Sequence, residues 1–395
     1  MLLRKLRLID GAGAVHEGVD IRIREGRFIE IGPVLASGGP ELDTDGCTAI
    51  PGLIDAHTHL SLDATPQAFE HAQGWSHSYQ ALGAARRAEE LLTNGVTTAR
   101  DVGGVASLIF GLRDGISDGL TAGPRIFAAG AWLTATGGHG WPIGVEADGS
   151  DEVRRAVREQ LKAGSDLIKL MASGGVIGPG LGPNAVQFSE EEVAIAATEA
   201  HGAAKTVAAH AHGADSIRNA VRGGVDTIEH GSFLTPKLIE EMREQGTFLV
   251  PTLAVVPLVL GHAEEAGIEA HTVERGHEVA EVQRKNVAAA HRAGVSIVAG
   301  TDMGTPFTTP DTIHAEIGAL AGIGLTHHEA IQAATFQGAR SLGLDNDLGT
   351  VQPGRRADLL VLDGDPLADL SATRRIRHLL QDGQLRIRDG VRVRD

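Results

Sequence analysis

Several apolar segments of this chain end in polar side chains of the kinds that bind metal ions. The candidates are His57, His59, Lys169, His210, His230 and Asp302. His57 and His59 stand two residues apart, so on a β-strand both point to the same side. Imidazole nitrogens and carboxylate oxygens are common ligands of zinc and similar divalent ions. A lone strand histidine is usually a core residue and an aspartate can merely cap a turn, so the metal prediction depends on all six meeting.

Lys169 is the most unusual candidate because it lies within the apolar segment 166–171. It is one of only six lysines, against 29 arginines. Burial disfavours the charged ammonium, so a buried lysine readily loses its proton. A neutral amine can react with CO2 to form a carbamate, which is an anionic oxygen ligand able to bridge two metal ions. An ion pair with a neighbouring carboxylate is the alternative, and the accompanying histidines favour the carbamate.

The central part of the chain must position these candidates, and there short apolar segments alternate with helical patterns. Strands are expected at 52–59, 95–102, 124–131, 166–172, 206–212, 226–230, 247–253 and 296–302. Helices are expected at 80–94, 150–162, 189–202, 215–222 and 273–293, the third opened by a capping box of Ser189 and Glu192. Eight such units predict an α/β fold, a (β/α)8 TIM barrel, with a doubly wound open sheet as the alternative. The strands of a parallel barrel end at one face, which would gather the candidates there.

The two ends of the chain follow a different pattern. Residues 1–50 and 350–395 alternate apolar and polar side chains and are punctuated by glycines, which predicts short antiparallel strands joined by tight turns. Each end alone is too short to bury a core. We therefore expect both ends to build one small β-sandwich domain, and residues 51–349 to build the barrel.

The composition excludes several classes of protein. Hydrophobic residues make up 42% and charged residues 22% of the 395 residues, which is ordinary globular usage and argues against disorder. The net charge of −16 argues against binding to nucleic acid or to an anionic membrane surface. Cys47 is the only cysteine, so an internal disulfide is excluded. The longest apolar run, 247–260, is too short for a bilayer and predicts a buried strand that leads into a loop. With no signal-like segment, a cytoplasmic location is expected, and a homo-oligomer remains open.

The motifs around the candidates resemble those of the amidohydrolase superfamily, in particular its imidazolonepropionase-like and Xaa-Pro dipeptidase-like branch. The matching stretches are PGLIDAHTH at 51–59, IKLMASGG at 168–175, HAHG at 210–213, IEHG at 228–231 and GTD at 300–302, together with LIDG at 8–11 and GRRADLLVL at 354–362. The resemblance implies a barrel with a β-sandwich and two metal ions, zinc being the expected element. It places one ion on His57, His59 and Asp302 and the other on His210 and His230, with carboxylated Lys169 as the bridge.

The same resemblance implies hydrolysis of an amide bond. Two close divalent ions would hold a bridging water and lower its pKa, so that hydroxide forms at neutral pH. Asp302 would take the proton and deliver it to the departing amine. His139 and His212 are candidate substrate contacts, although His212 could instead support the metal ligand His210. The implied substrate is a dipeptide or an N-acyl amino acid.

The distribution of charge restricts that substrate. The stretches 55–85, 126–153, 170–204, 244–274 and 303–339, which follow expected strands, contain no lysine or arginine. Acids do follow the first and third strands, namely Asp63, Glu70, Glu146, Asp148 and Asp151. A neutral or cationic small-molecule amide is therefore expected to be preferred. Selectivity is expected to depend on the loops 60–80 and 255–273.

Three other readings of the site remain. A cyclic amide hydrolase resembling imidazolonepropionase would use one metal ion, and Lys169 counts against it because that chemistry needs no bridge. An esterase or phosphotriesterase would use the same ligands. A catalytically silent barrel that serves as a binding module is a reading of a different class, and the six filled ligand positions count against it.

Overall fold

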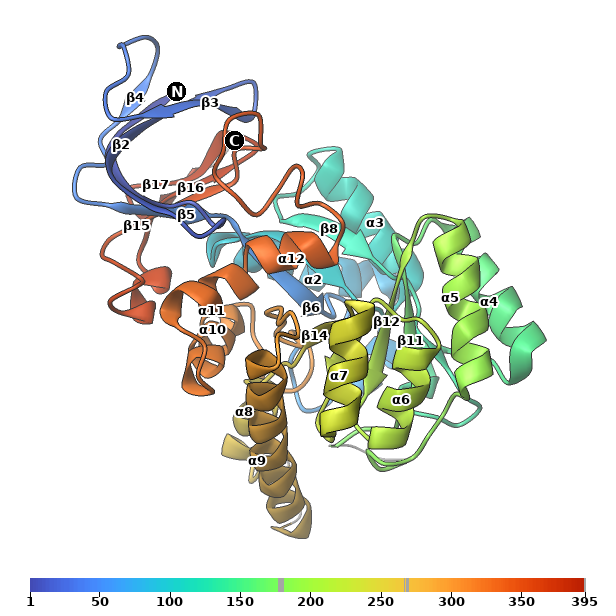
Figure 1. Ribbon diagram of the computed structural model, residues 1–395. Helices are drawn as coiled ribbons and strands as arrows, with labels where there is room; N and C mark the ends of the chain where they lie inside the picture. The colour runs from blue at the N-terminus through green and yellow to red at the C-terminus, as the bar shows by residue number, and fades with distance from the viewer. Residues whose placement is uncertain (177–180, 266, 268–269, 394–395) are drawn as a thin grey trace.

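The computed structural model describes residues 1–176, 181–265, 267 and 270–393, and its centre is a barrel of parallel strands (Figure 1). The barrel strands are β6 (Leu53–Thr58), β7 (Val96–Asp101), β8 (Arg125–Ala128), β11 (Leu167–Met171), β12 (Thr206–Ala211), β13 (Thr227–His230) and β14 (Phe248–Val250). They form two parallel sheets, β6-β7-β8 and β11-β12-β13-β14. The two sheets meet where the Asp166 amide donates to the Ala128 carbonyl at 2.8 Å. Seven of the eight expected strands are therefore present.

The eighth expected strand, 296–302, is not a regular strand, so that prediction is wrong in detail. The segment makes one isolated parallel bridge, from Ile297 to Leu249, and the residue after it, Met303, makes another to Thr58. The segment still lies between β14 and β6 and closes the barrel. A Cβ added at Gly300 would come within 2.7 Å of the Cβ of His57, so glycine permits this close approach to β6. The positive φ of 58° at Asp302 then turns the backbone out of the extended conformation.

Helices surround the barrel (Figure 1). Those of the outer layer are α2 (His77–Thr93), α3 (Ala106–Ser117), α4 (Gly149–Ala163), α5 (Glu190–Gly202), α6 (Ala214–Arg222), α7 (Pro236–Gln245), α9 (Ala270–Arg292), α10 (Thr312–Gly322), α11 (His327–Ala333) and α12 (Phe336–Ser341). The capping box predicted at Ser189 and Glu192 is present at the start of α5. The helix expected from residue 150 begins at Gly149.

Short elements occupy the loops at the carboxyl ends of the strands. They are α1 (Ala68–Gly74), β9 (Leu133–Thr134), η1 (Trp141–Ile143), β10 (Val145–Glu146) and α8 (Val255–Gly261). Helix α8 corrects the prediction that the run 247–260 leaves a strand for a loop. Pro257 lies in the first turn of this helix, where its missing N–H is tolerated. Residues 266 and 268–269 of the loop expected to govern selectivity lie outside the described residues. No helix in the described part of the chain has the length and apolarity needed to cross a bilayer.

The two ends of the chain build one sheet beside the barrel (Figure 1). Its strands are β1 (Leu2–Ile9), β2 (Val15–Arg24), β3 (Arg27–Gly32), β4 (Glu41–Leu42), β5 (Thr48–Pro51), β15 (Leu359–Leu362), β16 (Ile376–Gln381), β17 (Gln384–Arg388) and β18 (Val391–Arg392), with a 3-10 helix, η2 (Leu370–Arg374), before β16. Strand β5 pairs in parallel with β1 and antiparallel with β15, which joins the two ends. Arg125 at the start of β8 donates to Asp358 and Asp382 and ties this β domain to the barrel.

Candidate metal centre

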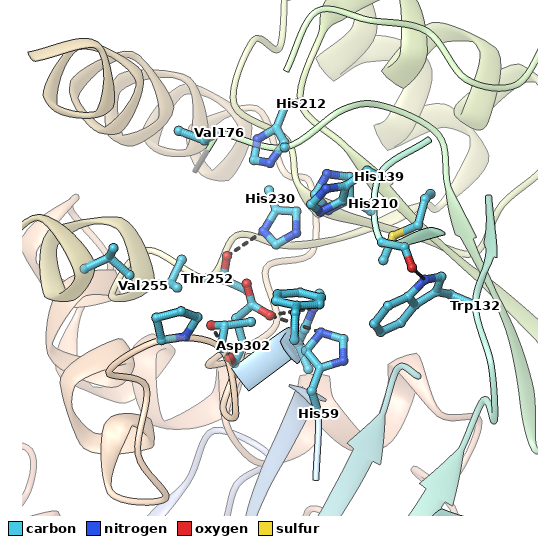
Figure 2. Close-up of a pocket in the computed structure, with 18 of the residues that line it drawn as sticks. His59, Trp132, His139, Val176, His210, His212, His230, Thr252, Val255 and Asp302 are labelled. Carbon is cyan, nitrogen blue, oxygen red and sulfur yellow. Dashed lines mark hydrogen bonds and ion pairs between the residues drawn. The ribbon is translucent and has the colours of Figure 1, made fainter. Parts of the chain in front are cut away.

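Residues from the first strand and the closing segment form one half of a polar cluster at the carboxyl end of the barrel (Figure 2). The Nε2 atoms of His57 and His59 lie 3.4 Å and 3.1 Å from the same Asp302 oxygen, Oδ1. All three side chains are buried and offer ligand atoms within 4.8 Å of one another. The left-handed backbone at Asp302 allows its side chain to reach the two rings. This trio has the composition and spacing of a metal site.

A second trio lies beside the first and consists of His210, His212 and His230. Their ring nitrogens are within 4.8 Å of one another. The ring centroids of His57 and His230 are 5.2 Å apart, so the two trios are adjacent. The structure thus brings together residues that lie up to 245 positions apart in the chain, from His57 to Asp302. It also places His212 with the metal-ligand candidates rather than apart from them.

Each of these histidines has one ring nitrogen engaged by the protein. The contacts are His57 Nδ1 to Glu229 Oε2 at 2.6 Å, His59 Nδ1 to Gly103 O at 2.7 Å, His210 Nε2 to Gly174 O at 3.2 Å, His212 Nδ1 to Ser232 Oγ at 2.8 Å and His230 Nδ1 to Thr252 Oγ1 at 2.7 Å. Metal-binding histidines are oriented in the same way, by a partner on the nitrogen that does not bind the ion. The remaining nitrogen of His57 and of His59, Nε2, faces Asp302, and that of the other three rings is left for a ligand.

Lys169 lies on β11 among these histidines and is fully buried. Its Nζ atom has no hydrogen-bond partner, so the predicted alternative of an ion pair with a neighbouring carboxylate is not what the structure shows. Burial lowers the pKa of Lys169 to about 8, and the positive charge of Arg100 adds to this effect. A buried amine without a partner is costly in either charge state.

The local electrostatics favour the metal-binding forms of four histidines and of Asp302, whereas at His59 the effect of burial is outweighed by Asp302, which raises its pKa. Burial lowers the pKa of His212 to about 3 and that of His139 to about 4, and it holds His210 and His230 well below the usual value. Burial alone would raise the pKa of Asp302, but the adjacent His57 and His59 hold it well below the usual range. Neutral imidazoles and an ionised carboxylate are the protonation states required for metal binding.

The candidate substrate contact His139 lies in the loop between β9 and η1 and lines the cavity over the trios (Figure 2). Its ring centroid is 4.6 Å from that of His210. A Cβ at Gly175 would come within 2.7 Å of the His139 ring, so the glycine makes room for it. Its ring faces the same space as the metal-ligand candidates.

Three further residues of the site escaped the sequence analysis. Trp132 follows β8 and packs edge-on against His59, with 5.5 Å between ring centroids. Glu229 and Arg100 lie on barrel strands, are fully buried, and are hydrogen-bonded to one another. A signal for the last two was present, because charged residues within otherwise apolar strands need a partner.

The cavity over the metal-ligand candidates has a volume of about 570 Å³. Its walls are mostly apolar: Phe69, Trp132 and Trp141 contribute aromatic surface, and Val176, Val255, Val256 and Val259 contribute aliphatic surface. Lys169 is the only lysine or arginine among the described residues that line it, and Glu70 and Asp302 are the only acids. Of the five acids noted in the sequence, only Glu70 on α1 lines the cavity. The other four bind elsewhere, to His71, Gly137, Thr136 and Arg154.

Residues 48–385 match the sequence profile of the amidohydrolase family. The chain is 32% identical to the ochratoxinase of Aspergillus niger over 367 residues, which cover 85% of this chain and 75% of that protein. A solved prolidase complexed with N-methylphosphonate-L-proline superposes with a TM-score of 0.91 at 30% identity, over 98% of this chain and 99% of that one. A solved Xaa-Pro dipeptidase with methionine bound in its active site gives 0.88 at 31% identity, over 97% and 98%.

This chain therefore belongs to the amidohydrolase family. Its relatives confirm the predicted fold, a TIM barrel with a β-sandwich built from both termini. They also confirm that it is a metal-dependent hydrolase of amide bonds with two histidine-rich sites, related to prolidases and to ochratoxinase.

Proposed function

We propose that this amidohydrolase uses a binuclear metal centre to cleave the amide bond of a dipeptide or an N-acyl amino acid. The observation that carries the proposal is the pair of adjacent trios with the buried, partnerless amine of Lys169 beside them. Relatives at about 30% identity are a prolidase and an Xaa-Pro dipeptidase, which supports a dipeptide-like substrate.

The residues fit such a centre. His57, His59 and Asp302 would hold one ion, His210 and His230 the other, and Lys169 as a carbamate would contact both. The nitrogens already engaged by the protein leave His57 Nε2, His59 Nε2 and His230 Nε2 available, and they leave Nδ1 of His210. Bound divalent ions, with zinc as the expected element, would supply Lewis acidity and lower the pKa of the attacking water.

Asp302 is placed to move the proton. It is ionised at neutral pH and faces the centre of the site, so it can accept a proton from the attacking water. It can then pass that proton to the departing amine nitrogen. His139 and His212 are neutral and line the same cavity, so their ring N–H groups can donate to substrate oxygens. His212 also stacks on His230, with 4.7 Å between ring centroids, and this contact suits a supporting role for that ligand.

The charge of the cavity supports a neutral or cationic substrate. Lys169 is the only basic side chain on the described walls, and as a carbamate it would be negative. A substrate carboxylate would therefore meet no fixed cation of the protein. A positive group could approach Glu70, which is exposed at the rim next to Phe69. The apolar walls suit hydrophobic groups on both sides of the amide.

The other readings make distinguishable demands. A cyclic amide hydrolase with one ion needs no bridging ligand, so it leaves the buried Lys169 unexplained. Ester or phosphotriester hydrolysis uses the same ligands, so only substrate comparison separates it from amide hydrolysis. A catalytically silent binding module does not require metal-ligand atoms to converge, so it leaves their arrangement unexplained.

Metal analysis of the purified protein, joined to a substrate panel, tests the proposal. We expect about two zinc ions per chain and turnover of dipeptides or N-acyl amino acids, with a di-acidic dipeptide among the poorest. Lys169→Met is expected to lower the metal content below two, whereas Lys162→Met on the exposed face of α4 leaves it unchanged. One ion per chain in the wild type, or hydrolysis confined to esters, contradicts the proposal. A preference for di-acidic dipeptides contradicts only the charge argument.

A further inference from the structure

An ion pair crosses the interior of the barrel directly below the metal-ligand candidates. The Arg100 guanidinium extends from β7 and donates from Nη2 to both Glu229 oxygens on β13, at 2.8 Å and 3.0 Å. It also donates from Nη1 to Thr227 Oγ1 at 3.0 Å and from Nε to the Ala56 carbonyl. Both charged residues are fully buried. Such a pair is tolerated because the two-pronged geometry and the added hydrogen bonds satisfy both charges.

The carboxylate of this pair is shared with a metal-ligand candidate. Glu229 Oε2 lies 2.6 Å from Nδ1 of His57. A carboxylate is an acceptor, so with an ion bound at Nε2 the single proton of His57 would reside on Nδ1. Nε2 of the same ring lies 3.4 Å from Asp302 Oδ1, on the side where the ion would bind. Arg100 additionally holds Ala56, the residue before His57, through its backbone carbonyl.

His57 and His59 both face Asp302 through Nε2, but among the described residues His57 is the only histidine of the two trios whose other ring nitrogen also has a charged partner. The other four rings contact backbone carbonyls or hydroxyls, belonging to Gly103, Gly174, Ser232 and Thr252. A carboxylate on the far nitrogen fixes the tautomer more strongly and makes the ring a stronger metal ligand than a neutral acceptor does. The affinity of the two metal positions should therefore respond differently to loss of this pair.

We propose that the buried Arg100–Glu229 pair is a positioning device that fixes the tautomer and orientation of His57 and so secures the ion held by His57, His59 and Asp302. This inference rests on the proposed binuclear function. Glu229 orients the ring, and Arg100 orients and neutralises Glu229. Neither residue lines the cavity, so neither meets the substrate.

Substitutions of the pair distinguish positioning from a general contribution to folding. Glu229→Gln keeps the shape, but it removes the negative charge and replaces one acceptor oxygen by an NH2 donor, which cannot accept from Arg100. Arg100→Lys keeps the positive charge, but an ammonium cannot make the two-pronged hydrogen bond of a guanidinium to a carboxylate. Asp358→Asn is the matched control, because it removes a buried carboxylate that pairs with Arg125 at 3.1 Å, at the amino end of the barrel and outside the cavity.

The readouts are the rate at which a chelator removes zinc from the loaded protein and the visible spectrum of the cobalt-substituted protein. We expect Glu229→Gln to weaken one of the two ions by about 10- to 100-fold, with the second ion retained, and to change the cobalt spectrum. Arg100→Lys should show a smaller loss of the same ion, and Asp358→Asn should match the wild type in both readouts.

The proposal is overturned if Glu229→Gln folds, loses zinc to the chelator at the wild-type rate and has the wild-type cobalt spectrum. It is also overturned by an equal weakening of both ions, or by a failure of both pair variants to fold while Asp358→Asn folds, because the pair then serves the barrel as a whole. If the wild type holds only one ion, the binuclear function fails. Comparison of the variants with the wild type for that one ion still decides whether the pair positions His57.

Discussion

The β domain and the mouth of the barrel are both tightly buried, but they bury different chemistry. The β domain core consists of apolar side chains such as Leu3, Leu6, Phe28 and Val361, all with no exposed surface. The barrel mouth buries Arg100, Glu229, Lys169 and the histidines to the same degree. Apolar burial stabilises a fold directly, whereas buried charge costs free energy unless every group finds a partner.

The ion pairs of the two regions differ in the same way. In the β domain, Arg4 pairs with Glu41 at 2.7 Å, and the two side chains remain 23% and 38% exposed. Such pairs contribute little to stability. At the barrel mouth, the pairs are closed off from water and end on metal-ligand candidates. The comparison indicates that the β domain contributes mainly to stability and the barrel mouth mainly to turnover. Substitutions in the β domain should therefore leave turnover unchanged, and substitutions at the barrel mouth should leave stability unchanged.

Asp302→Asn tests the functional half of this comparison and should have the largest effect. The amide cannot accept the proton from the attacking water, so we expect kcat to fall by about 10³-fold or more. Much of the bound metal should remain, because the carboxamide oxygen can still face His57 and His59. Steady-state kinetics with metal analysis measure both. Asp311→Asn, which removes an exposed pair with Arg374, should leave kcat unchanged. A near-native rate in Asp302→Asn would remove Asp302 from the proton transfer.

Phe28→Ala tests the structural half. This side chain on β3 is fully buried, and its loss should lower the apparent free energy of unfolding by about 3–5 kcal/mol. The kcat/KM of the folded protein should stay within twofold of the wild type. Urea denaturation and steady-state kinetics provide the two readouts. Ile29→Ala on the exposed face of the same strand is the control, with a loss below about 1 kcal/mol. A parallel fall of kcat/KM in Phe28→Ala would show that the β domain and the active site are coupled.

The sequence predicts the two regions to different depths, for the same physical reason. Period-2 alternation reveals the strands of the β domain, because apolar side chains there report directly on burial. The isolated polar residues of the barrel strands reveal His57, Lys169 and His230, because polar groups in buried strands are conspicuous. Seven barrel strands follow from short apolar runs.

What the sequence does not reveal depends on contacts between distant segments. The irregular closing segment follows from the close approach of Gly300 to His57, which no local pattern encodes. The Arg100–Glu229 pair joins two strands 129 residues apart, so the sequence shows a charge within each strand but not that the two pair with each other. Helix α8 is hidden because an apolar run with Pro257 fits a strand end equally well. Local pattern therefore identifies which residues are unusual, but only tertiary structure identifies their partners.

Glu316 provides the smallest test, because it is a buried acid with no ion pair in the described structure. It lies on α10, and its Oε2 accepts the amide of Ala254 at 2.8 Å, just before α8. Its Oε1 has no partner. Burial raises the pKa of Glu316 to about 8, although the amides of Leu253 and Ala254 oppose the shift. Glutamate in an unfolded chain titrates near pH 4.3.

Between about pH 4.3 and pH 8 the folded protein therefore holds a proton that the unfolded chain has released, so stability falls as pH rises through this window. Glu316→Gln mimics the protonated form at every pH. We expect its Tm to match the wild type near pH 5 and to exceed it by a few degrees at pH 9. Glu329→Gln is the control with the opposite sign: backbone and side-chain hydrogen bonds from Thr326 lower the pKa of Glu329, so its ionised form stabilises the protein above pH 4.3, and the variant should melt lower there. Equal pH profiles for Glu316→Gln and the wild type would show that this buried acid is ionised without cost, which would weaken the contrast drawn between the two regions.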